Sequence, residues 1–335
     1  MLLFSIEHPV LEKVFELACL LLSLAVSPPM WIVFFRQSEA HLLAKRMGGR
    51  AGFLKASGVR DGLTWKVWFR VKVTWSTLFG RRHRVTPTVR VHVEGPIGWT
   101  ATRRDAFDSA ADRLGYGGPK IGDPGFDAVI CLDGDATLLA AVMSTATEDL
   151  ALDWVGAGGE IHPSGVSLVV PDEGTDRQVE WIERAIATVL ALRPPSDLNT
   201  ALMARAISAE LGPSLRAGAA LGSSAPPALA DLLRKRARAQ LGKGHMEVPA
   251  LMALTALETR SDDMTDAILP ILSAPQDEVR LAAVRALGRL GMPAAVPALH
   301  ELPAGAPWST LSKAVDEATA EINRSSDAPW THAVR

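Results

Sequence analysis

Four aspartates within a short stretch are the first candidates for chemistry in this sequence. They are Asp123, Asp127, Asp133 and Asp135. Clustered carboxylates can bind Ca²⁺, but these lack the Asp-x-Asp-x-Asp-Gly order and the closing glutamate of an EF-hand loop. Turn formation and helix capping explain aspartates at such positions better than a calcium loop does. We therefore predict turn and cap roles here, and no metal site.

Catalytic motifs are absent from the sequence. There is no Gly-x-x-x-x-Gly-Lys-Ser/Thr phosphate loop, no Gly-x-Ser-x-Gly elbow and no His-Glu-x-x-His. His162 and Ser164 are only sequence neighbours, and the glycines of residues 156–159 fit a hairpin turn. Cys19 and Cys131 have neither metal nor redox spacing. We expect no enzyme activity, no catalytic or metal-ligating residues, and no cofactor.

Arginines on predicted helices are the remaining candidates, and we predict that they bind a partner. One group is Arg280, Arg285 and Arg289, and the other is Arg234, Lys235, Arg236 and Arg238. Arg280 has a structural alternative, in which it reaches across to a neighbouring helix pair. The second group has two alternatives, a solvated helix face or contact with nucleic acid or an acidic protein.

The first group lies on the helix predicted for residues 277–291. Asp277 follows Pro275 and suits the N-cap position, and Gly291 followed by Pro293 ends the helix. The residues at helical spacing form one apolar stripe: Val279, Ala282, Ala283, Ala286, Leu287 and Leu290. The alanines in this stripe allow neighbouring helices to approach closely.

A lone helix cannot bury such a stripe, so the sequence should contain repeats. Leu281-Ala-Ala-Val-Arg-Ala-Leu287 is echoed thirty residues earlier by Leu251-Met-Ala-Leu-Thr-Ala-Leu257. The pattern predicts three helical pairs, at about 226–258, 265–291 and 293–323. The alternative is an ordinary helical bundle.

With its Asp-x-Val-Arg start, the 277–291 segment resembles the second helix of a HEAT repeat, of the short kind found in phycobilisome-lyase-like proteins. The resemblance implies a non-catalytic scaffold that binds a protein partner, whose identity the sequence does not reveal. Two alternatives are nucleic-acid backbone binding through basic helix and hairpin faces, and a lyase- or isomerase-like enzyme with the array as substrate cradle. We do not expect nucleic acid as the partner.

Residues 17–35 are nineteen residues without a formal charge, which just reaches the length that crosses a bilayer. The glutamates at 7, 12 and 16 argue against a signal peptide. Pro28 and Pro29 interrupt the run. It is either a kinked membrane anchor or a buried helix followed by a strand at residues 31–35, with a cleaved or lipidated terminus as a further alternative.

Charge is distributed unevenly along the chain. Residues 36–104 contain fifteen Lys or Arg and three acidic residues, whereas the remainder is net acidic. A basic segment directly after an apolar run fits the positive-inside rule. We therefore predict a location at the cytoplasmic membrane with the bulk in the cytoplasm, and anionic lipid contact by residues 36–104. The alternative is a soluble cytoplasmic protein.

Residues 63–75 and 88–93 alternate apolar and polar side chains, which predicts an antiparallel hairpin with one basic face. Further along we predict helices at 136–147 and 175–192 and strands at 128–132, 151–155 and 166–170. The Gly-Asp-x-x-Phe-Asp motif at residues 122–127 gives this region a weak resemblance to bacterial membrane-anchored proteins.

The sequence thus predicts a multi-domain protein: an N-terminal hydrophobic helix, a central α+β domain with antiparallel strands and a C-terminal all-α HEAT-repeat array. The predicted domains are a hydrophobic segment at 1–35, the basic α+β domain at 36–193, a linker with a helix at 194–225, the array at 226–323 and a tail at 324–335.

Overall fold

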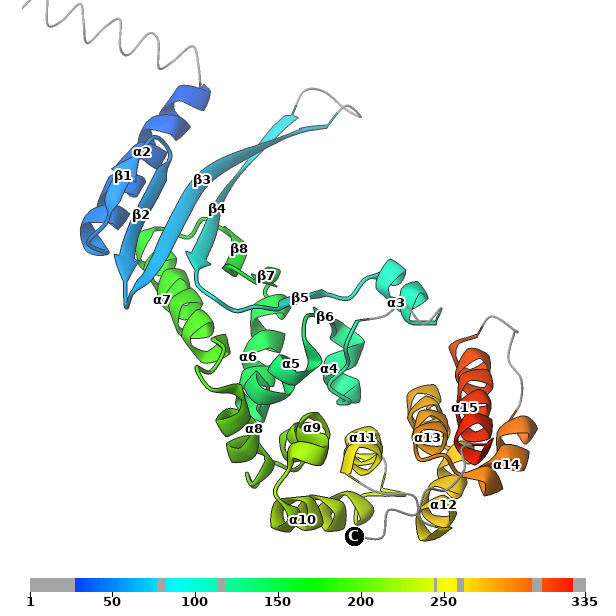
Figure 1. Cartoon of the computed structure of the whole chain (residues 1–335). Coiled ribbons are helices and arrows are strands. Elements are labelled where there is room, and N and C mark those ends of the chain that lie inside the picture. The colour runs from blue at the N-terminus through cyan, green and yellow to red at the C-terminus, as the bar shows by residue number, and fades with distance from the viewer. Residues whose placement is uncertain are drawn as a thin grey trace, which may run out of the picture. The chain divides into compact units, whose positions relative to one another are not determined.

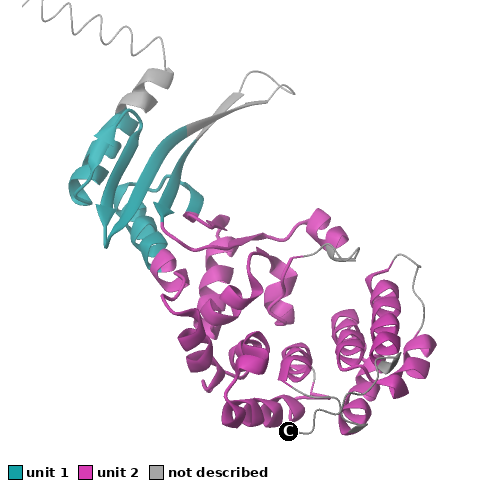
Figure 2. Ribbon diagram, viewed as in Figure 1, with its two compact units in different colours: residues 1–94, 167–187 teal, residues 95–166, 188–335 magenta. Residues whose placement is uncertain are grey.

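The fold is taken from a computed structural model, which describes residues 28–76, 82–113, 118–243, 246–257, 262–302 and 309–327. The chain forms two compact units (Figure 2). Unit 1 comprises residues 1–94 with 167–187, and unit 2 comprises residues 95–166 with 188–335. Each unit is described by itself.

Unit 1 contains an antiparallel set of strands together with helices (Figure 1). Its elements are α2 (Pro28–Arg46), β1 (Arg50–Gly52), β2 (Lys55–Arg60), β3 (Leu63–Ser76), β4 (Arg82–Glu94), most of β8 (Gly165–Pro171) and most of α7 (Thr175–Leu192). The strand order is β1-β2-β3-β4-β8. Val67 pairs with Val91 in the long β3–β4 hairpin, and Trp65 is fully buried on the same face. The predicted hairpin is confirmed.

Helix α2 includes residues 31–35, so the predicted strand at this position is wrong. Pro28 and Pro29 are the first residues of α2, where proline is tolerated because the first helical N–H groups have no intrahelical acceptor to lose. Ala40, Leu43 and Met47 recur at helical spacing and are buried.

The predicted membrane anchor lies largely on residues 17–27, outside the described part of the chain. In the described residues, no helix combines the length and apolar character needed to span a bilayer.

The first part of unit 2 mixes short strands and helices. It contains β5 (Thr100–Arg103), α3 (Ala106–Arg113), α4 (Pro124–Val129), β6 (Ile130–Asp133), α5 (Ala136–Val142), α6 (Thr145–Gly156) and β7 (Gly159–His162). β5 pairs antiparallel with β6 and with β7. The predicted strand at 151–155 is wrong because this segment belongs to α6. A capping box between Ser144 and Thr147 starts α6, and Ala151, Trp154 and Val155 are buried along it.

The rest of unit 2 is a stack of helical pairs (Figure 1). It contains α8 (Leu198–Ala206), α9 (Leu211–Leu221), η1 (Gly222–Ser224), α10 (Pro227–Arg238), α11 (Glu247–Leu257), α12 (Asp262–Ile268), η2 (Leu269–Ser273), α13 (Asp277–Arg289), η3 (Pro293–Ala295), α14 (Val296–Glu301) and α15 (Thr310–Asp327). Each predicted pair is present in the described residues. Helices α9, α11, α13 and α15 pack consecutively against one another.

Helices α8 and α9 lie in the segment predicted as a linker with a helix, and they precede the three predicted pairs. One hydrophobic core runs from Ala140 of α5 through these helices to Ile322 of α15. The array is therefore continuous with the α5–α6 part of unit 2. The domain boundaries at 35, 193 and 225 stay predictions.

The stripe predicted for α13 is largely confirmed, since all its residues are buried except the half-buried Ala282. Gly288 lies so close to α15 that an added Cβ would be 2.7 Å from the Cα of Ala318. The predicted N-cap is wrong: Asp277 is the first helical residue, and Gln276 at the N-cap makes no side-chain hydrogen bond. The Asp277 carboxylate pairs with Arg280 instead. Gly291, with a φ of 61°, follows the helix end as predicted.

Candidate functional site

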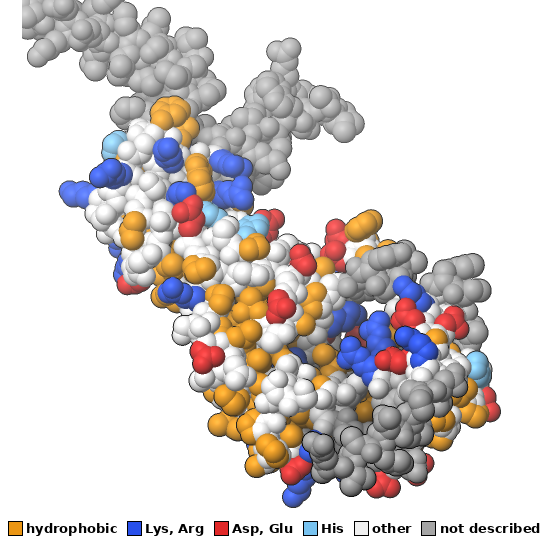
Figure 3. Space-filling view, in the orientation of Figure 1, with side chains coloured by type: hydrophobic (Ala, Val, Ile, Leu, Met, Phe, Trp, Pro, Cys, Tyr) orange, Lys and Arg blue, Asp and Glu red, His pale blue; other side chains and the backbone are white. Residues whose placement is uncertain are grey.

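A cavity of about 810 Å³ opens on the array within unit 2. Four alternate helices, α9, α11, α13 and α15, contribute to its lining. The segment 118–122, Asp127 and residues of α5 complete it. Figure 3 shows a hollow on this part of the molecule, with Lys, Arg, Asp and Glu side chains at its edges. The face that the repeats share is therefore concave.

Small side chains make much of the cavity wall. The array helices contribute Ala219, Ala220, Ala256, Ala282, Ala286, Ala314 and Ala318, and α5 contributes Ala136 and Ala140. Because alanine projects little from a helix, successive helices approach closely and leave the wall recessed. Met252 of α11 and Leu281 of α13 supply larger apolar surface, and Met252 is 41% exposed. The wall can therefore accept apolar side chains from a partner.

Charged groups surround this apolar wall. Arg285 and Arg289 lie one turn apart on α13, line the cavity and are exposed. Neither forms a hydrogen bond or an ion pair with the residues that the structure describes. Glu317 and Glu321 of α15 line the same cavity. These groups can form ion pairs with a bound partner.

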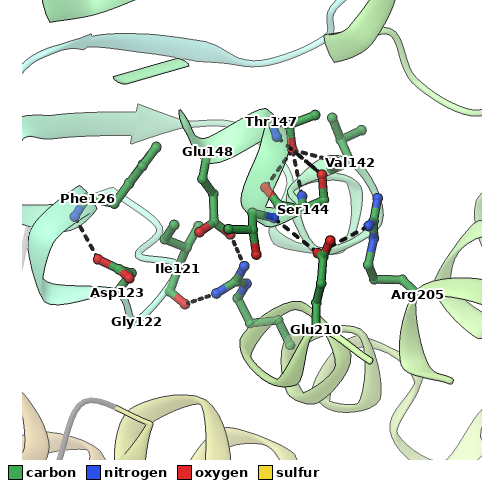
Figure 4. A network of polar contacts seen from close by, with 12 residues as sticks. Ile121, Gly122, Asp123, Phe126, Val142, Ser144, Thr147, Glu148, Arg205 and Glu210 are labelled. Carbon is green, nitrogen blue, oxygen red and sulfur yellow. Dashed lines mark hydrogen bonds and ion pairs between the residues drawn. The ribbon is translucent and has the colours of Figure 1, made fainter. Parts of the chain in front are cut away.

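A buried ion pair holds the first array helices against α6. The Arg216 guanidinium of α9 pairs with the Glu148 carboxylate and donates a hydrogen bond of 3.0 Å to the Ile121 carbonyl (Figure 4). The Arg216 side chain is only 6% exposed. Burial disfavours the charged form of both groups, so it lowers the pKa of Arg216 and raises the pKa of Glu148. The two charges compensate each other in a desolvated position.

A second contact also joins α6 to the start of α9. Thr145, the first residue of α6, donates its N–H to the Glu210 carboxylate at 3.1 Å, and Arg205 lies 3.7 Å from that carboxylate (Figure 4). Together with the Arg216 pair, this contact positions α9 relative to the 118–127 segment that closes the cavity.

Asp127 is a cavity residue whose pKa is strongly raised. Its carboxylate accepts N–H groups from Ile121 at 3.2 Å and Gly122 at 2.8 Å. Burial raises the pKa of Asp127 to about 6; the two backbone hydrogen bonds oppose this rise. Because both bonds go to the adjacent turn, Asp127 fixes the shape of the cavity wall.

Two of the other aspartates have the predicted cap role, whereas Asp133 is the last residue of β6. Asp123 accepts the Phe126 N–H at 2.9 Å and caps α4, and Asp135 accepts the Leu138 N–H at 2.8 Å and caps α5. The described residues contain no group of three or more His, Cys, Asp or Glu side chains placed to hold a metal ion.

The arginines predicted to bind a partner lie in different places. Arg285 and Arg289 line the cavity. Arg280 does not, because its guanidinium donates to the Ala274 carbonyl at 3.2 Å and pairs with Asp277 at the start of its own helix. This geometry supports a structural role within the α12–α13 pair.

Two residues of the α10 group also donate hydrogen bonds to backbone carbonyls. Arg234 donates to the Leu257 carbonyl at the end of α11, at 2.6 and 3.0 Å. Arg236 donates to the Ser208 carbonyl at 3.0 Å, beyond the end of α8. Lys235 and Arg238 are exposed and lie outside the cavity lining. A partner-binding role for this group stays a prediction.

Sequence reasoning missed Lys120, Arg216, Met252 and Glu278 as cavity residues. Lys120 and Glu278 form an ion pair although 158 residues separate them. Arg216 had a local signal, since it is the only charged residue in the otherwise apolar and small-residue helix α9. The other three have no such signal.

Helical pairs with a shared concave face define the C-terminal part of unit 2 as a helical-repeat protein. Residues 238–318 match the family model of HEAT repeats, so this part of the chain is a HEAT-repeat array, as its resemblance implied. No curated protein and no solved structure matches the chain. HEAT repeats are generally non-catalytic scaffolds for protein interactions.

Proposed function

We propose that this protein is a non-catalytic scaffold that holds a segment of a partner protein in the cavity of its HEAT-repeat array. The observation that carries the proposal is the concave wall formed by α9, α11, α13 and α15. The wall has an apolar alanine surface, and the arginines at its edge pair with no residue that the structure describes. A surface of this kind fits an amphipathic polypeptide segment, which buries apolar side chains against the wall and pairs its polar groups at the rim.

The charge of the cavity favours a protein segment over nucleic acid. Four basic and four acidic side chains line it: Lys120, Arg216, Arg285, Arg289, Asp127, Glu278, Glu317 and Glu321. A phosphate backbone requires a clear excess of positive charge. The balanced lining supports a partner with both signs of charge.

The titratable groups also favour a binding role over the lyase- or isomerase-like alternative. Asp127 has a raised pKa, which is a property of many catalytic acids. Its two oxygens are, however, engaged by the Ile121 and Gly122 N–H groups, and Arg216 is paired with Glu148. These bonds account for both groups as structural parts of the wall.

We also propose that the scaffold is held at the cytoplasmic face of the membrane. This part of the proposal is supported by the uncharged run at residues 17–35 and by the excess of basic residues in 36–104. An anchored array would present its cavity to partners close to the bilayer.

Site-specific photocrosslinking in the native cell tests the scaffold proposal. A photoreactive amino acid replaces Met252 in the cavity, and a matched control replaces Leu232 on α10, because these side chains are 41% and 40% exposed. Leu232 does not line the cavity. We expect a defined protein adduct from position 252 that position 232 does not give, and we expect Arg289→Glu to reduce it. Identical adducts from both positions would contradict the proposal.

A further inference from the structure

The outward face of the unit 1 strands is rich in basic side chains. Two cross-strand rows follow from the register. One row is Arg50, Ser57, Lys66 and His92; the other is Lys55, Trp68 and Arg90. Side chains alternate between the faces of a strand, so these rows lie opposite the buried row of Ala56, Val67 and Val91. Arg70 shares the outward parity, and we call this surface the basic sheet face.

The basic sheet face has cations without compensating charges. Lys66 pairs with Glu94, but four cations form no ion pair with any residue that the structure describes. They are Arg50, Lys55, Arg70 and Arg90. In the space-filling view, Lys and Arg side chains gather over the strands of unit 1 (Figure 3).

An exposed phenylalanine lies at the end of the β1–β2 hairpin, two residues before Lys55. Phe53 is 74% exposed. The side-chain amide of Gln37 on α2 forms hydrogen bonds with the residues on both sides of Phe53. The Gln37 Nε2 donates to the Gly52 carbonyl at 3.2 Å, and its Oε1 accepts the Leu54 N–H at 2.9 Å.

Leu54 in this turn has a φ of 50°, which is a costly conformation for a leucine. The turn is therefore held in one conformation against local strain, with Phe53 projecting into solvent. Strained turns that are held in this way occur preferentially at functional sites.

We propose that the basic sheet face lies on an anionic lipid bilayer, with Phe53 reaching below the headgroups. The unpaired cations would contact phosphate and carboxylate groups of the lipids, and the ring of Phe53 would gain by leaving water. The inference rests on the membrane location in the proposed function, and it identifies the surface and the lipid class that this location uses.

A single-stranded nucleic acid is another negatively charged partner that could bind the basic sheet face. Such partners bind to rows of exposed aromatic rings that stack on successive bases. On the described part of the basic sheet face, Trp68 and His92 are the rings, and they contact each other with centroids 6.2 Å apart. A fixed apolar side chain near a cationic face fits a bilayer better.

The test uses the full chain with Cys19 and Cys131 replaced by serine and an environment-sensitive fluorophore on Phe53→Cys. The matched control carries the fluorophore on Phe107→Cys in unit 2, where the phenylalanine is 78% exposed. We expect a blue shift at position 53, and none at 107, on vesicles that contain phosphatidylserine. Pure phosphatidylcholine vesicles should give a much smaller shift.

Charge reversal on the face should weaken this signal. Arg70→Glu removes one favourable charge and adds an unfavourable one, so the apparent vesicle affinity should fall by roughly tenfold to thirtyfold at low salt. Arg193→Glu, the same change at an exposed position of unit 2, should leave the affinity within about twofold.

Four outcomes would overturn the inference. The first is an equal shift on both lipids, and the second is an Arg70→Glu effect no larger than that of Arg193→Glu. The third is tighter binding to a single-stranded oligonucleotide than to phosphatidylserine vesicles, with the same sensitivity to Arg70→Glu. If the chain floats with vesicles while the probe at 53 stays in water, this surface is wrong and the proposed membrane location survives.

Discussion

Replacing Asp127 by asparagine should change how the stability of the protein depends on pH. The Asp127 carboxyl is 5% exposed and accepts two backbone N–H groups. Burial raises its pKa from the ordinary 3.8 to about 6, and the nearby Glu278 adds to the rise, while the backbone hydrogen bonds and Lys120 oppose it. Asparagine keeps the shape of the side chain but has no proton to lose.

The sign and size follow from linkage. The folded pKa of Asp127 lies above the unfolded value, so its contribution to stability is fully present below the unfolded pKa and is lost as the pH rises through the folded pKa. The difference between the pKa values of 3.8 and about 6 corresponds to about 3 kcal/mol. The free energy of unfolding of the natural chain, minus that of Asp127→Asn, should therefore decrease by about 3 kcal/mol between about pH 3.5 and pH 7.

Urea unfolding at a series of fixed pH values, followed by circular dichroism, measures this difference. Groups that Asp127 does not influence contribute equally to the free energy of unfolding of both proteins at each pH. Their contributions therefore cancel in the difference. Asp197→Asn is a control of opposite sign, because hydrogen bonds from Thr200 lower the pKa of Asp197. The corresponding difference for Asp197→Asn should grow as the pH rises. A difference for Asp127→Asn that is constant, or that grows with pH, would refute the burial argument.

Two further substitutions test the packing of unit 2. Arg216→Met should lower the free energy of unfolding by about 3–5 kcal/mol, because it leaves a buried carboxylate unpaired, whereas the exposed Arg289→Met should change it by less than about 0.5 kcal/mol. Similar urea midpoints for the two variants would show that the buried pair contributes little. Gly288→Ala should destabilise by about 1–3 kcal/mol, because the new Cβ would lie 2.7 Å from Ala318, although alanine favours helix. Gly156→Ala, where the Cβ enters open space, should be stabilised by up to about 1 kcal/mol. Melting temperatures that rise for both glycine variants would exclude a close α13–α15 contact.

Elements whose signal lies in contiguous residues could be predicted from the sequence alone. The apolar stripe of α13 and the alternation along β3 and β4 each report which side of one element is buried, because the helical and strand periods are local properties. The end of α13 before Gly291 could likewise be predicted from neighbouring residues alone. Recurrence of the stripe at a spacing of about thirty residues then predicted the repeats, which the family match confirms.

Local signals failed where two patterns competed. The apolar residues 151–155 suit a buried strand as well as a buried helix, and the capping box at Ser144 decided for the helix. The apolar residues 31–35 likewise suit a strand as well as a helix, and they belong to α2, whose first turn contains Pro28 and Pro29.

Which charged residues form the site depends on the tertiary fold. Arg280 and Arg285 are indistinguishable as helix-surface arginines in the sequence, yet the Ala274 carbonyl lies beside Arg280 and the cavity lies beside Arg285. The Lys120–Glu278 pair joins residues that are far apart in the chain, and no local pattern encodes such a contact. The concave face exists because alanine-lined helices stack closely, whereas its chemistry depends on side chains that the fold brings together from separate segments.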